Sequence, residues 1–377
     1  MKWKKKKLCE CTEYITDGDH QPAPKADKGV HFIKIKDIVN NQVSFDAQVY
    51  VPQEYYDNLP MERKPQKEDV LYTIVGSFGI PSYVQTDELF CFERNIALLH
   101  PNKDIEPRFL YYSLKNPAFY KGVEIVANGS AQKLIPLSKL KDLKILVPDK
   151  EAQRHIADIL SAYDDLIENN QRQIKLLEEA AQRLYKEWFV DLNFPGHENT
   201  KIVDGVPEGW SRGLLKELIS VNYGKDHKKA PDDGNIPVYG SGGLMRKCNK
   251  SLFSGEAVLI PRKGSLNNIM YVDETFWTVD TMFYATMKQP HTAVFVYFFV
   301  KAFDMYSMNI GAAVPSMTTK ILDAMDVVIP DKETLEKFDK LTKTYFNKIK
   351  TLQGQNERLK IARDLLLPKL MSGEVEV

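Results

Sequence analysis

The stretch Leu143-Lys-Ile-Leu-Val-Pro-Asp-Lys-Glu151 recurs later in the chain as Met325-Asp-Val-Val-Ile-Pro-Asp-Lys-Glu333. The ending Pro-Asp-Lys-Glu is identical in the two copies, and apolar residues occupy matched positions before it. At the same offset Gly129-Ser-Ala131 matches Gly311-Ala-Ala313, and at other offsets, but in the same order along the chain, Val70-Leu71 matches Val258-Leu259 and Trp3 matches Trp210. A shared order with changing offsets indicates an internal duplication with insertions and deletions. Each half of the chain is therefore predicted to be one structural unit.

Both units mix strand and helix signals. Strand-like runs such as Val30–Ile35, Val70–Val75 and Ala257–Pro261 alternate with Gly, Pro and Asn turns. Helical patterns cover Glu106–Leu114 and Thr292–Phe303. The predicted fold class is α+β, with two tandem mixed α/β domains.

A heptad pattern begins after Asp149 and returns after Asp331. In each copy the seam positions alternate spacings of four and three, which is typical of paired helices. The seams are Ile156, Leu160, Tyr163, Ile167, Asn170, Ile174, Leu177, Ala181, Leu184 and Trp188, then Phe338, Thr342, Tyr345, Ile349, Leu352, Asn356, Leu359, Arg363, Leu366 and Leu370. Two long helices are predicted, with Asp149 and Asp331 as N-caps. The second seam is weaker because it includes Thr342 and Arg363 and because Gly354 lies within the helix.

The seam asparagines decide how the helices pair. Asn170 is the fifth of ten positions and Asn356 is the sixth of ten, so a fully overlapping antiparallel pair places them opposite each other. Each amide then satisfies the other and fixes the register, whereas a parallel pair places each against an apolar residue. We therefore predict an antiparallel coiled coil with Asn170 and Asn356 as its register residues.

The repeats and the heptads together define six predicted segments. They are domain 1 (1–148), a first long helix (149–192), a linker (193–206), domain 2 (207–330), a second long helix (331–370) and a C-terminal tail (371–377).

Composition excludes several classes of protein. The 377 residues include 51 Lys+Arg and 51 Asp+Glu, so no overall positive charge indicates nucleic acid. The four cysteines form no C-x-x-C pair, which predicts reduced, buried thiols and no metal site. The basic N-terminus precedes no apolar run, and no apolar segment is long enough to span a bilayer. A cytoplasmic protein without membrane contact is expected.

Enzyme motifs do not appear. There is no G-x-x-x-x-G-K-[ST] loop, and Gly240-Ser-Gly-Gly243 does not fit a dinucleotide motif. Asn116-Pro-Ala-Phe119 is similar to an amino-methyltransferase signature but lacks its second proline and a glycine-rich cofactor loop, so a turn is predicted. No catalytic residue and no bound cofactor are predicted.

Three loops rich in cationic and hydrogen-bonding residues occupy matched places in the two units. They are 16–20 with Lys25 and Lys28, matched by 223–229; 76–79, matched by 262–268; and 128–133, matched by 309–320. Such side chains read base edges and bind phosphates, but they are also common on protein surfaces. The residues alone leave both interpretations open.

The chain resembles the specificity subunit of type I restriction-modification systems. The resemblance covers the whole chain and is carried by five motifs. These are Ile135-Pro-Leu with Leu146-Val-Pro-Asp-Lys-Glu-Ala-Gln-Arg-His-Ile-Ala-Asp-Ile-Leu160, Leu184-Tyr-Lys-Glu-Trp-Phe-Val-Asp191, Val206-Pro-Glu-Gly-Trp210, Ile236-Pro-Val-Tyr-Gly-Ser241 and Leu366-Leu-Pro-Lys-Leu-Met-Ser-Gly-Glu374.

The resemblance implies two target recognition domains related by an approximate two-fold axis through the coiled coil. It implies a bipartite, asymmetric site on double-stranded DNA with one half-site for each domain. Two methyltransferase subunits holding S-adenosylmethionine, and restriction subunits using ATP and Mg²⁺, are the implied partners, with no catalysis in this chain. Trp188 and Phe189 are candidates either for methyltransferase contact or for a local cap on the coiled coil.

Two other classes compete with this interpretation: a duplicated, non-catalytic protein-interaction scaffold, and a methyltransferase fragment, which the missing cofactor motifs disfavour. Under the DNA hypothesis the candidate contact residues lie in and beside the three loops. They are Asp17, His20, Lys25, Lys34, Lys36, Ser77, Tyr83, Asn128, Ser130, Gln132 and Lys133 in domain 1, and Lys225, His227, Lys228, Tyr239, Ser241, Arg246, Arg262, Lys263, Ser265, Asn267, Asn268, Thr319 and Lys320 in domain 2.

Overall fold

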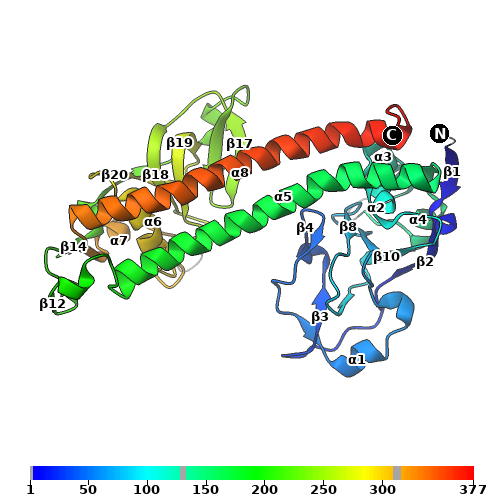
Figure 1. Cartoon of the computed structure of the whole chain (residues 1–377), viewed down its shortest axis with the longest axis horizontal. Coiled ribbons are helices and arrows are strands. Elements are labelled where there is room, and N and C mark those ends of the chain that lie inside the picture. The colour runs from blue at the N-terminus through cyan, green and yellow to red at the C-terminus, as the bar shows by residue number, and fades with distance from the viewer. Residues whose placement is uncertain (1–2, 128–132, 309–315) are drawn as a thin grey trace. The chain divides into compact units, whose positions relative to one another are not determined.

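A computed structural model describes residues 3–127, 133–308 and 316–377 (Figure 1). The chain divides into two compact units, and each is described by itself. Unit 1 comprises Met1–Asn170 with Gly354–Val377, and unit 2 comprises Gln171–Gln353. Helix α5 (Lys150–Tyr185) and helix α8 (Lys332–Ser372) each contribute one part to unit 1 and another part to unit 2.

Unit 1 contains a four-stranded antiparallel sheet in the order β2-β10-β7-β8 and a three-stranded sheet, β6-β3-β9, in which β3 and β9 are parallel. Its strands are β1 (Lys4–Lys7), β2 (Thr12–Asp17), β3 (Val30–Ile33), β4 (Ile38–Val39), β5 (Gln42–Val43), β6 (Tyr50–Val51), β7 (Val70–Thr73), β8 (Pro81–Tyr83), β9 (Phe90–Phe92), β10 (Ile96–Pro101) and β11 (Lys144–Val147). Its shorter helices are α1 (Gln53–Asp57), α2 (Pro107–Lys115), α3 (Pro117–Val126) and α4 (Leu137–Asp142).

Unit 2 contains a six-stranded sheet in the order β15-β20-β18-β19-β16-β17, in which only β16 and β19 pair in parallel. Its strands are β12 (Ile202–Val203), β13 (Val206–Pro207), β14 (Ser211–Leu214), β15 (Ile219–Tyr223), β16 (Ile236–Gly240), β17 (Gly243–Cys248), β18 (Phe253–Pro261), β19 (Met270–Thr278), β20 (Met282–Met287) and β21 (Asp326–Ile329). Its shorter helices are α6 (Ala293–Lys301) and α7 (Thr319–Asp323).

The strand pairing confirms the predicted duplication and the α+β class. The order β2-β10-β7-β8 in unit 1 corresponds to β15-β20-β18-β19 in unit 2. The short sheets at the entry to each long helix also match, because β1 pairs with β11 with Lys4 opposite Val147, and β14 pairs with β21 with Ser211 opposite Ile329. Unit 1 adds helix α3, for which the described residues of unit 2 contain no equivalent.

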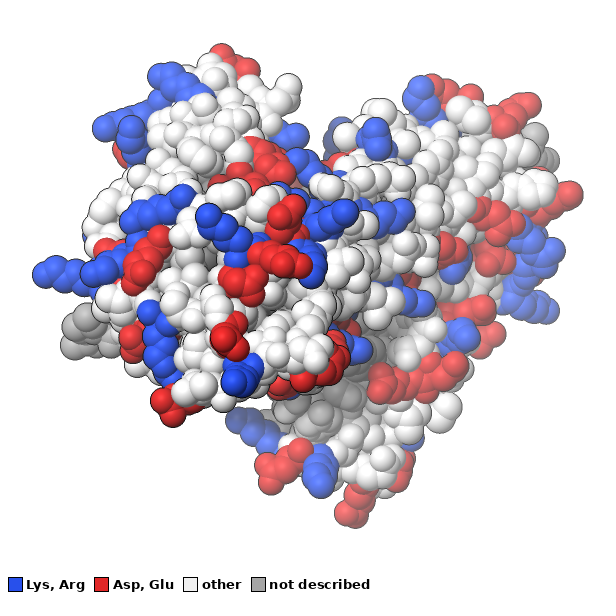
Figure 2. All heavy atoms as spheres, turned by 60° about the vertical axis from the view of Figure 1, so that its left-hand side comes forward, with Lys and Arg blue, Asp and Glu red and all other residues white. Residues whose placement is uncertain are grey.

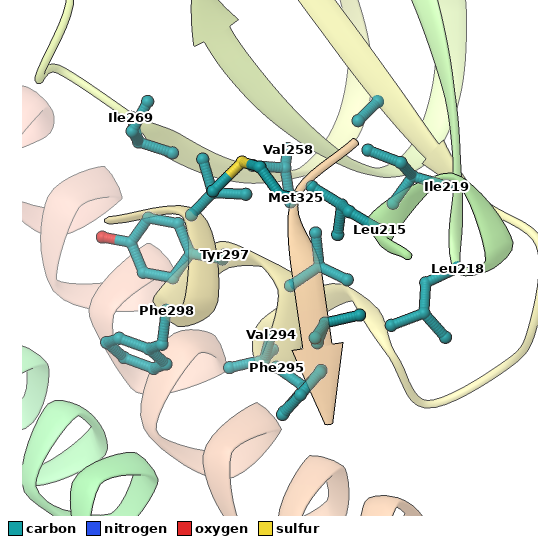
Figure 3. Packing of buried hydrophobic residues seen from close by; sticks show 14 of the residues in the cluster. Leu215, Leu218, Ile219, Val258, Ile269, Val294, Phe295, Tyr297, Phe298 and Met325 are labelled. Carbon is teal, nitrogen blue, oxygen red and sulfur yellow. The ribbon is translucent and has the colours of Figure 1, made fainter. Parts of the chain in front are cut away.

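Each unit has its own hydrophobic core, built between a sheet, a short helix and the long helices. In unit 2 the apolar helix α6 lies at the centre, where Val294 and Phe298 pack among Val258 and Met325 (Figure 3). In unit 1 helix α2 packs in the same way on strands β7 and β10 and on α5. Burying a large apolar side chain stabilises a fold by about 1.5–3 kcal/mol, so these helices fix each sheet to the coiled coil.

Within each unit the two long helices run antiparallel, as predicted. In unit 1 the amide of Asn170 donates to Oδ1 of Asn356 at 2.9 Å, and both side chains are at least 95% buried. In unit 2 the rings of Trp188 and Phe338 lie 5.8 Å apart, which pairs the last position of the first seam with the first position of the second. The predicted register is therefore confirmed at the asparagine layer and at the end of the seam that lies in unit 2.

The weak positions of the second seam have local explanations. The hydroxyl of Thr342 is fully buried and donates to the carbonyl oxygen of Phe338 in its own helix at 2.8 Å. Arg363 forms an ion pair with Asp164 of the partner helix. An added Cβ at Gly354 would meet nothing within 4 Å, and α8 continues through it.

The predicted helix caps are confirmed. Asp149 accepts a hydrogen bond from the amide of Ala152 at 3.0 Å, and Asp331 accepts one from the amide of Thr334 at 3.0 Å. Asp331 also accepts from the indole of Trp210 at 2.9 Å. The repeated tryptophan of unit 2 is thus anchored on the start of α8.

Two expectations need correction. Cys9 is exposed, although buried thiols are predicted, whereas Cys11, Cys91 and Cys248 are buried and free. Helix α5 does not stay regular to residue 192, because residues 186–190 form a π-helical turn. In the part of the chain that the structure describes, no helix is long and apolar enough to cross a membrane.

Candidate nucleic-acid interface

The second and third predicted loops meet in the same way in both units. In unit 1 the amide of Ile135 donates to the carbonyl oxygen of Ile74 at 2.9 Å, and in unit 2 the amide of Met317 donates to that of Arg262 at 2.9 Å. Isolated antiparallel bridges lie beside these bonds, between Val75 and Leu134 and between Lys263 and Ser316. The duplicated backbone thus places two loops of each unit side by side while their side chains differ.

Unit 2 presents several of the predicted residues on its surface. Its exposed candidates surround the loop junction or belong to the first loop: Lys225, Lys228, Lys263, Ser265, Asn267 and Lys320. His227 and Thr319 are half-buried, and they begin a 3-10 turn and helix α7, respectively.

Four other candidates in unit 2 hold the loops together. Arg246 pairs with Asp232 and donates to the carbonyl oxygens of His227 and Ala230. The hydroxyl of Tyr239 donates to Glu274 at 2.5 Å. The Asn268 amide donates to the carbonyl oxygen of Ser241 at 2.8 Å, which fixes the segment after β16 against the second loop.

Unit 1 places its candidates in three groups. Asp17 and His20 contact each other at 3.1 Å. Lys25 and Lys34 line one cavity of about 380 Å³. Lys36, Ser77 and Lys133 are exposed and form the third group, and His20 and Lys25 are exposed as well.

The remaining candidate of unit 1 is Tyr83, and Arg108 lies 5.6 Å from the centre of its ring. Burial raises the pKa of Tyr83 to about 12, so its hydroxyl stays protonated at neutral pH. Asn128, Ser130 and Gln132 lie outside the described residues.

Half-buried or exposed aromatic residues beside cations are a feature that the sequence analysis did not predict. In unit 1 the rings of Phe78 and Tyr120 stack with centroids 5.9 Å apart, and Lys133 lies 5.6 Å from the centre of the Phe78 ring. In unit 2 Arg262 lies over Tyr223. The sequence did offer a signal, because Phe78 lies within a glycine-containing loop and Tyr223 directly precedes Gly224. An aromatic residue at such a position is not held inside a sheet, so its ring can remain at the surface.

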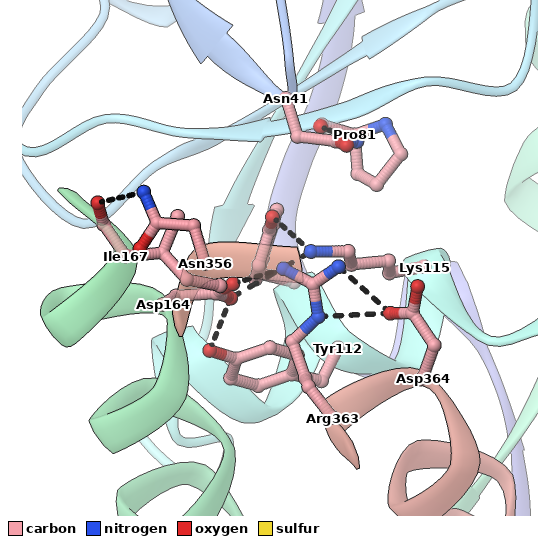
Figure 4. Close-up of polar contacts among 10 residues, drawn as sticks. Asn41, Pro81, Tyr112, Lys115, Asp164, Ile167, Asn356, Arg363 and Asp364 are labelled. Atoms are coloured by element: carbon pink, nitrogen blue, oxygen red, sulfur yellow. Dashed lines mark hydrogen bonds and ion pairs between the residues drawn. The ribbon is translucent and has the colours of Figure 1, made fainter. Parts of the chain in front are cut away.

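A polar cluster joins helix α2 of unit 1 to both long helices (Figure 4). Asp164 of α5 accepts a hydrogen bond from the hydroxyl of Tyr112 at 2.7 Å and pairs with Arg363 of α8. Lys115 lies 3.6 Å from the same carboxylate, and burial lowers the pKa of Lys115 although Asp164 opposes that change. These contacts fix helix α2 of unit 1 on its part of the coiled coil.

A second polar cluster does the same in unit 2. Lys343 of α8 contacts Asp339 at 3.0 Å and Glu256 of strand β18 at 3.3 Å. Glu256 accepts a hydrogen bond from the hydroxyl of Tyr271 on β19 at 2.7 Å. Burial acts to lower the pKa of Lys343, but the two carboxylates raise it, so the lysine stays charged.

The face drawn in Figure 2 carries no single basic patch. On the side drawn in Figure 2, Lys and Arg are interspersed with Asp and Glu. Non-specific attraction to phosphates requires a cluster of positive charge. This face therefore offers no broad positive field, and its positive charge is confined to local groups of Lys and Arg.

Two further observations concern chemistry. Within the described residues no group of three or more His, Cys, Asp or Glu side chains is arranged to hold a metal ion. The side chain of Asn116 accepts a hydrogen bond from the amide of Ala118 at 3.0 Å and caps helix α3. Its Asn-Pro sequence thus begins a helix, where the sequence predicted a turn.

Trp188 and Phe189 belong to the core of unit 2. Trp188 is 6% exposed, and the ring of Phe189 lies 4.8 Å from that of Phe338 and 4.9 Å from that of Phe295. These contacts favour the local cap over a surface for a methyltransferase.

The amino-acid sequence matches a known protein family and individual members of it. The family described as "Type I restriction modification DNA specificity domain" matches residues 1–179 and 207–360. The specificity subunit of the type I restriction enzyme MjaIX of Methanocaldococcus jannaschii is 26% identical over 325 residues, which cover 75% of this chain and 72% of the relative. That of HindI of Haemophilus influenzae is 23% identical over 449 residues, covering 92% of this chain and 94% of the relative.

A solved structure shares the fold. The crystal structure of the S subunit of a type I restriction-modification system from M. genitalium superposes with a TM-score of 0.64 at 19% identity, covering 98% of this chain and 96% of that one. The family match spans both halves of the chain and most of its residues. The chain therefore belongs to the family of type I restriction-modification DNA specificity domains, the specificity subunits of these systems.

Proposed function

We propose that this chain selects the DNA sequence on which a type I restriction-modification complex acts. Each recognition domain reads one short half-site of a bipartite, asymmetric site, with an unread spacer between the half-sites. The observation that carries the proposal is the loop junction that recurs in both units at matched backbone positions, Ile74 and Arg262, with different side chains around it. One scaffold with two sets of side chains suits two different half-sites.

The chemistry is proposed to reside in partner subunits. Two methyltransferase subunits would hold S-adenosylmethionine, restriction subunits would use ATP and Mg²⁺, and this chain would supply recognition without catalysis. Large apolar side chains on the long helices support docking, since Leu176 of α5 is 58% exposed and Ile361 and Leu365 of α8 are 60% and 66% exposed. Ile361 and Leu365 are four residues apart and share one face of α8, and apolar residues gathered on one face are typical of protein contacts.

Genome methylation tests the proposal directly. A host that lacks other methylation systems would receive this chain together with its methyltransferase subunits, and modified bases would be mapped by sequencing. We expect one bipartite, non-palindromic motif that disappears when this chain is omitted. Methylation without the chain, or without a defined motif, would contradict the proposal.

Salt dependence separates a DNA reader from a protein-interaction scaffold. The assembled complex would be titrated onto duplexes carrying the motif at 50 and 200 mM salt. A complex that neutralises six to ten phosphates loses about 10³–10⁵ in affinity over this range. A salt-independent shift, or no shift at all, would favour the scaffold.

A further inference from the structure

A half-buried arginine and an exposed tyrosine form a pair at the loop junction of unit 2. The guanidinium carbon of Arg262 lies 5.5 Å from the centre of the Tyr223 ring. The ring is itself held, because it meets Phe283 edge to face with centroids 5.0 Å apart, yet 53% of Tyr223 remains exposed. A guanidinium stacked on a fixed ring loses rotational freedom and keeps its N–H groups free to point outward along its edge.

Arg262 differs from the other arginines of the second recognition domain. Arg246 is bound by a carboxylate and two carbonyl oxygens, and Arg212 donates to the carbonyl oxygen of Asp204 at 2.6 Å. Among the described residues, no hydrogen bond or ion pair to the guanidinium of Arg262 is present, and the guanidinium lies over the tyrosine ring. Its hydrogen-bond donors are thus oriented but have no acceptor within the described part of the protein.

The surroundings suit a nucleic acid. Lys263, the next residue, and Lys225, which lies two residues beyond Tyr223, are both exposed and extend from the same two loops. The backbone around them is fixed, because the amides of Arg262 and Lys263 both donate to the carbonyl oxygen of Thr281 at 2.8 and 3.2 Å. The arginine supplies a fork of hydrogen-bond donors held over a ring, and the two exposed lysines beside it supply positive charge for phosphates.

Unit 1 lacks this pair at the corresponding positions. Arg262 corresponds to Ile74, since both carbonyl oxygens accept the equivalent loop-junction hydrogen bond. Tyr223 corresponds to Asp17, since each pairs with the matching position of the neighbouring strand and precedes a glycine, Gly224 or Gly18, that packs on backbone. The feature therefore belongs to one half of the molecule.

We propose that Arg262, held on the Tyr223 ring, reads a guanine in the half-site of the second recognition domain. This inference rests on the proposed function. The guanidinium fork matches O6 and N7 of guanine in the major groove, and each of these atoms accepts one N–H bond. No other base offers two acceptors at that spacing in the major groove. The first domain, which has an isoleucine at the matched position, reads its half-site without this contact.

The test compares methylation motifs. Complexes containing wild-type chain, Arg262→Ala or Arg212→Ala would methylate the host genome, and duplexes with each base pair of the motif changed singly would be assayed in vitro. Arg262→Ala is expected to reduce discrimination at one G·C pair of one half-site by about 10- to 100-fold, leaving the other positions intact. Arg212→Ala is the matched control, because this exposed arginine lies on β14 away from the junction, and it should preserve the motif.

The outcomes distinguish the inference from the proposed function. A wild-type complex that yields no motif would overturn both. A wild-type motif that Arg262→Ala leaves unchanged, or that relaxes at a base pair other than G·C or in the other half-site, would overturn the inference alone. So would failure of a folded Arg262→Ala chain to assemble with the methyltransferase subunits, because the pair would then be a protein contact. Arg262→Met, which keeps the apolar stem on the ring, replaces the alanine variant if circular dichroism shows that the latter is unfolded.

Discussion

The buried asparagine pair of the coiled coil supports the sharpest prediction about the fold. Asn170→Leu removes the 2.9 Å bond to Asn356 and leaves Oδ1 of Asn356 without a donor, in a layer where both residues are at most 5% exposed. The side-chain nitrogen of Asn356, Nδ2, keeps a long hydrogen bond of 3.5 Å to the carbonyl oxygen of Ile167. An unsatisfied buried polar group costs about 1–3 kcal/mol, so the free energy of unfolding should fall by about that amount.

Urea denaturation followed by far-UV circular dichroism measures the loss. Asn169→Leu is the matched control, because Asn169 is exposed on the same helix turn and its replacement should change stability by less than about 0.5 kcal/mol. The double variant Asn170→Leu/Asn356→Leu should recover the loss, since no unpaired polar group remains and two leucines fill the layer. A single variant as stable as wild type, or a double variant that is no more stable than the single one, would refute this account of the register.

Three other variants test the contacts that hold each unit together. Arg363→Ala leaves the partly buried carboxylate of Asp164 without its strongest partner and should cost about 1–3 kcal/mol in urea denaturation, whereas an unchanged midpoint would count against the cluster. Burial acts to raise the pKa of Asp331, but the hydrogen bonds that its carboxylate accepts lower the pKa overall. The ionised carboxylate therefore stabilises the fold at neutral pH, and this stabilisation is lost as the pH falls below about 4. Asp331→Asn should remove that part of the pH dependence of the free energy of unfolding. Gly79→Ala should lower the melting temperature more than Gly209→Ala, because both glycines have positive φ, at 85° and 88°, but only at Gly79 would an added Cβ meet a neighbouring ring, at 2.5 Å.

The long helices and their register could be predicted because one physical rule dominates them. A heptad seam must bury its a and d positions, and a polar residue in the seam needs a polar partner, so Asn170 and Asn356 determined the direction of pairing. The caps at Asp149 and Asp331 follow from the same local logic, since free amides at a helix start require an acceptor.

The three pairs of candidate loops were much less predictable. Arg246 and Arg262 are the same residue type, yet one is bound by its own loop and the other lies over an exposed ring. That difference depends on where distant strands bring Asp232 and Tyr223, which no spacing within the sequence specifies. The pairing of Arg363 with Asp164 was missed for the same reason, because the carboxylate lies beside the seam position and comes from the other helix.

Exchange of one recognition domain tests the central claim most directly. Residues 207–330 would be replaced by the second recognition domain of a relative with a known motif, and the genome methylation of a host carrying the chimera and its methyltransferase subunits would be sequenced. The account predicts that one half-site changes to that of the relative while the other half-site stays as in the wild type. A motif unchanged on both sides, or changed on both, would contradict the claim that each duplicated unit reads its own half of the DNA site.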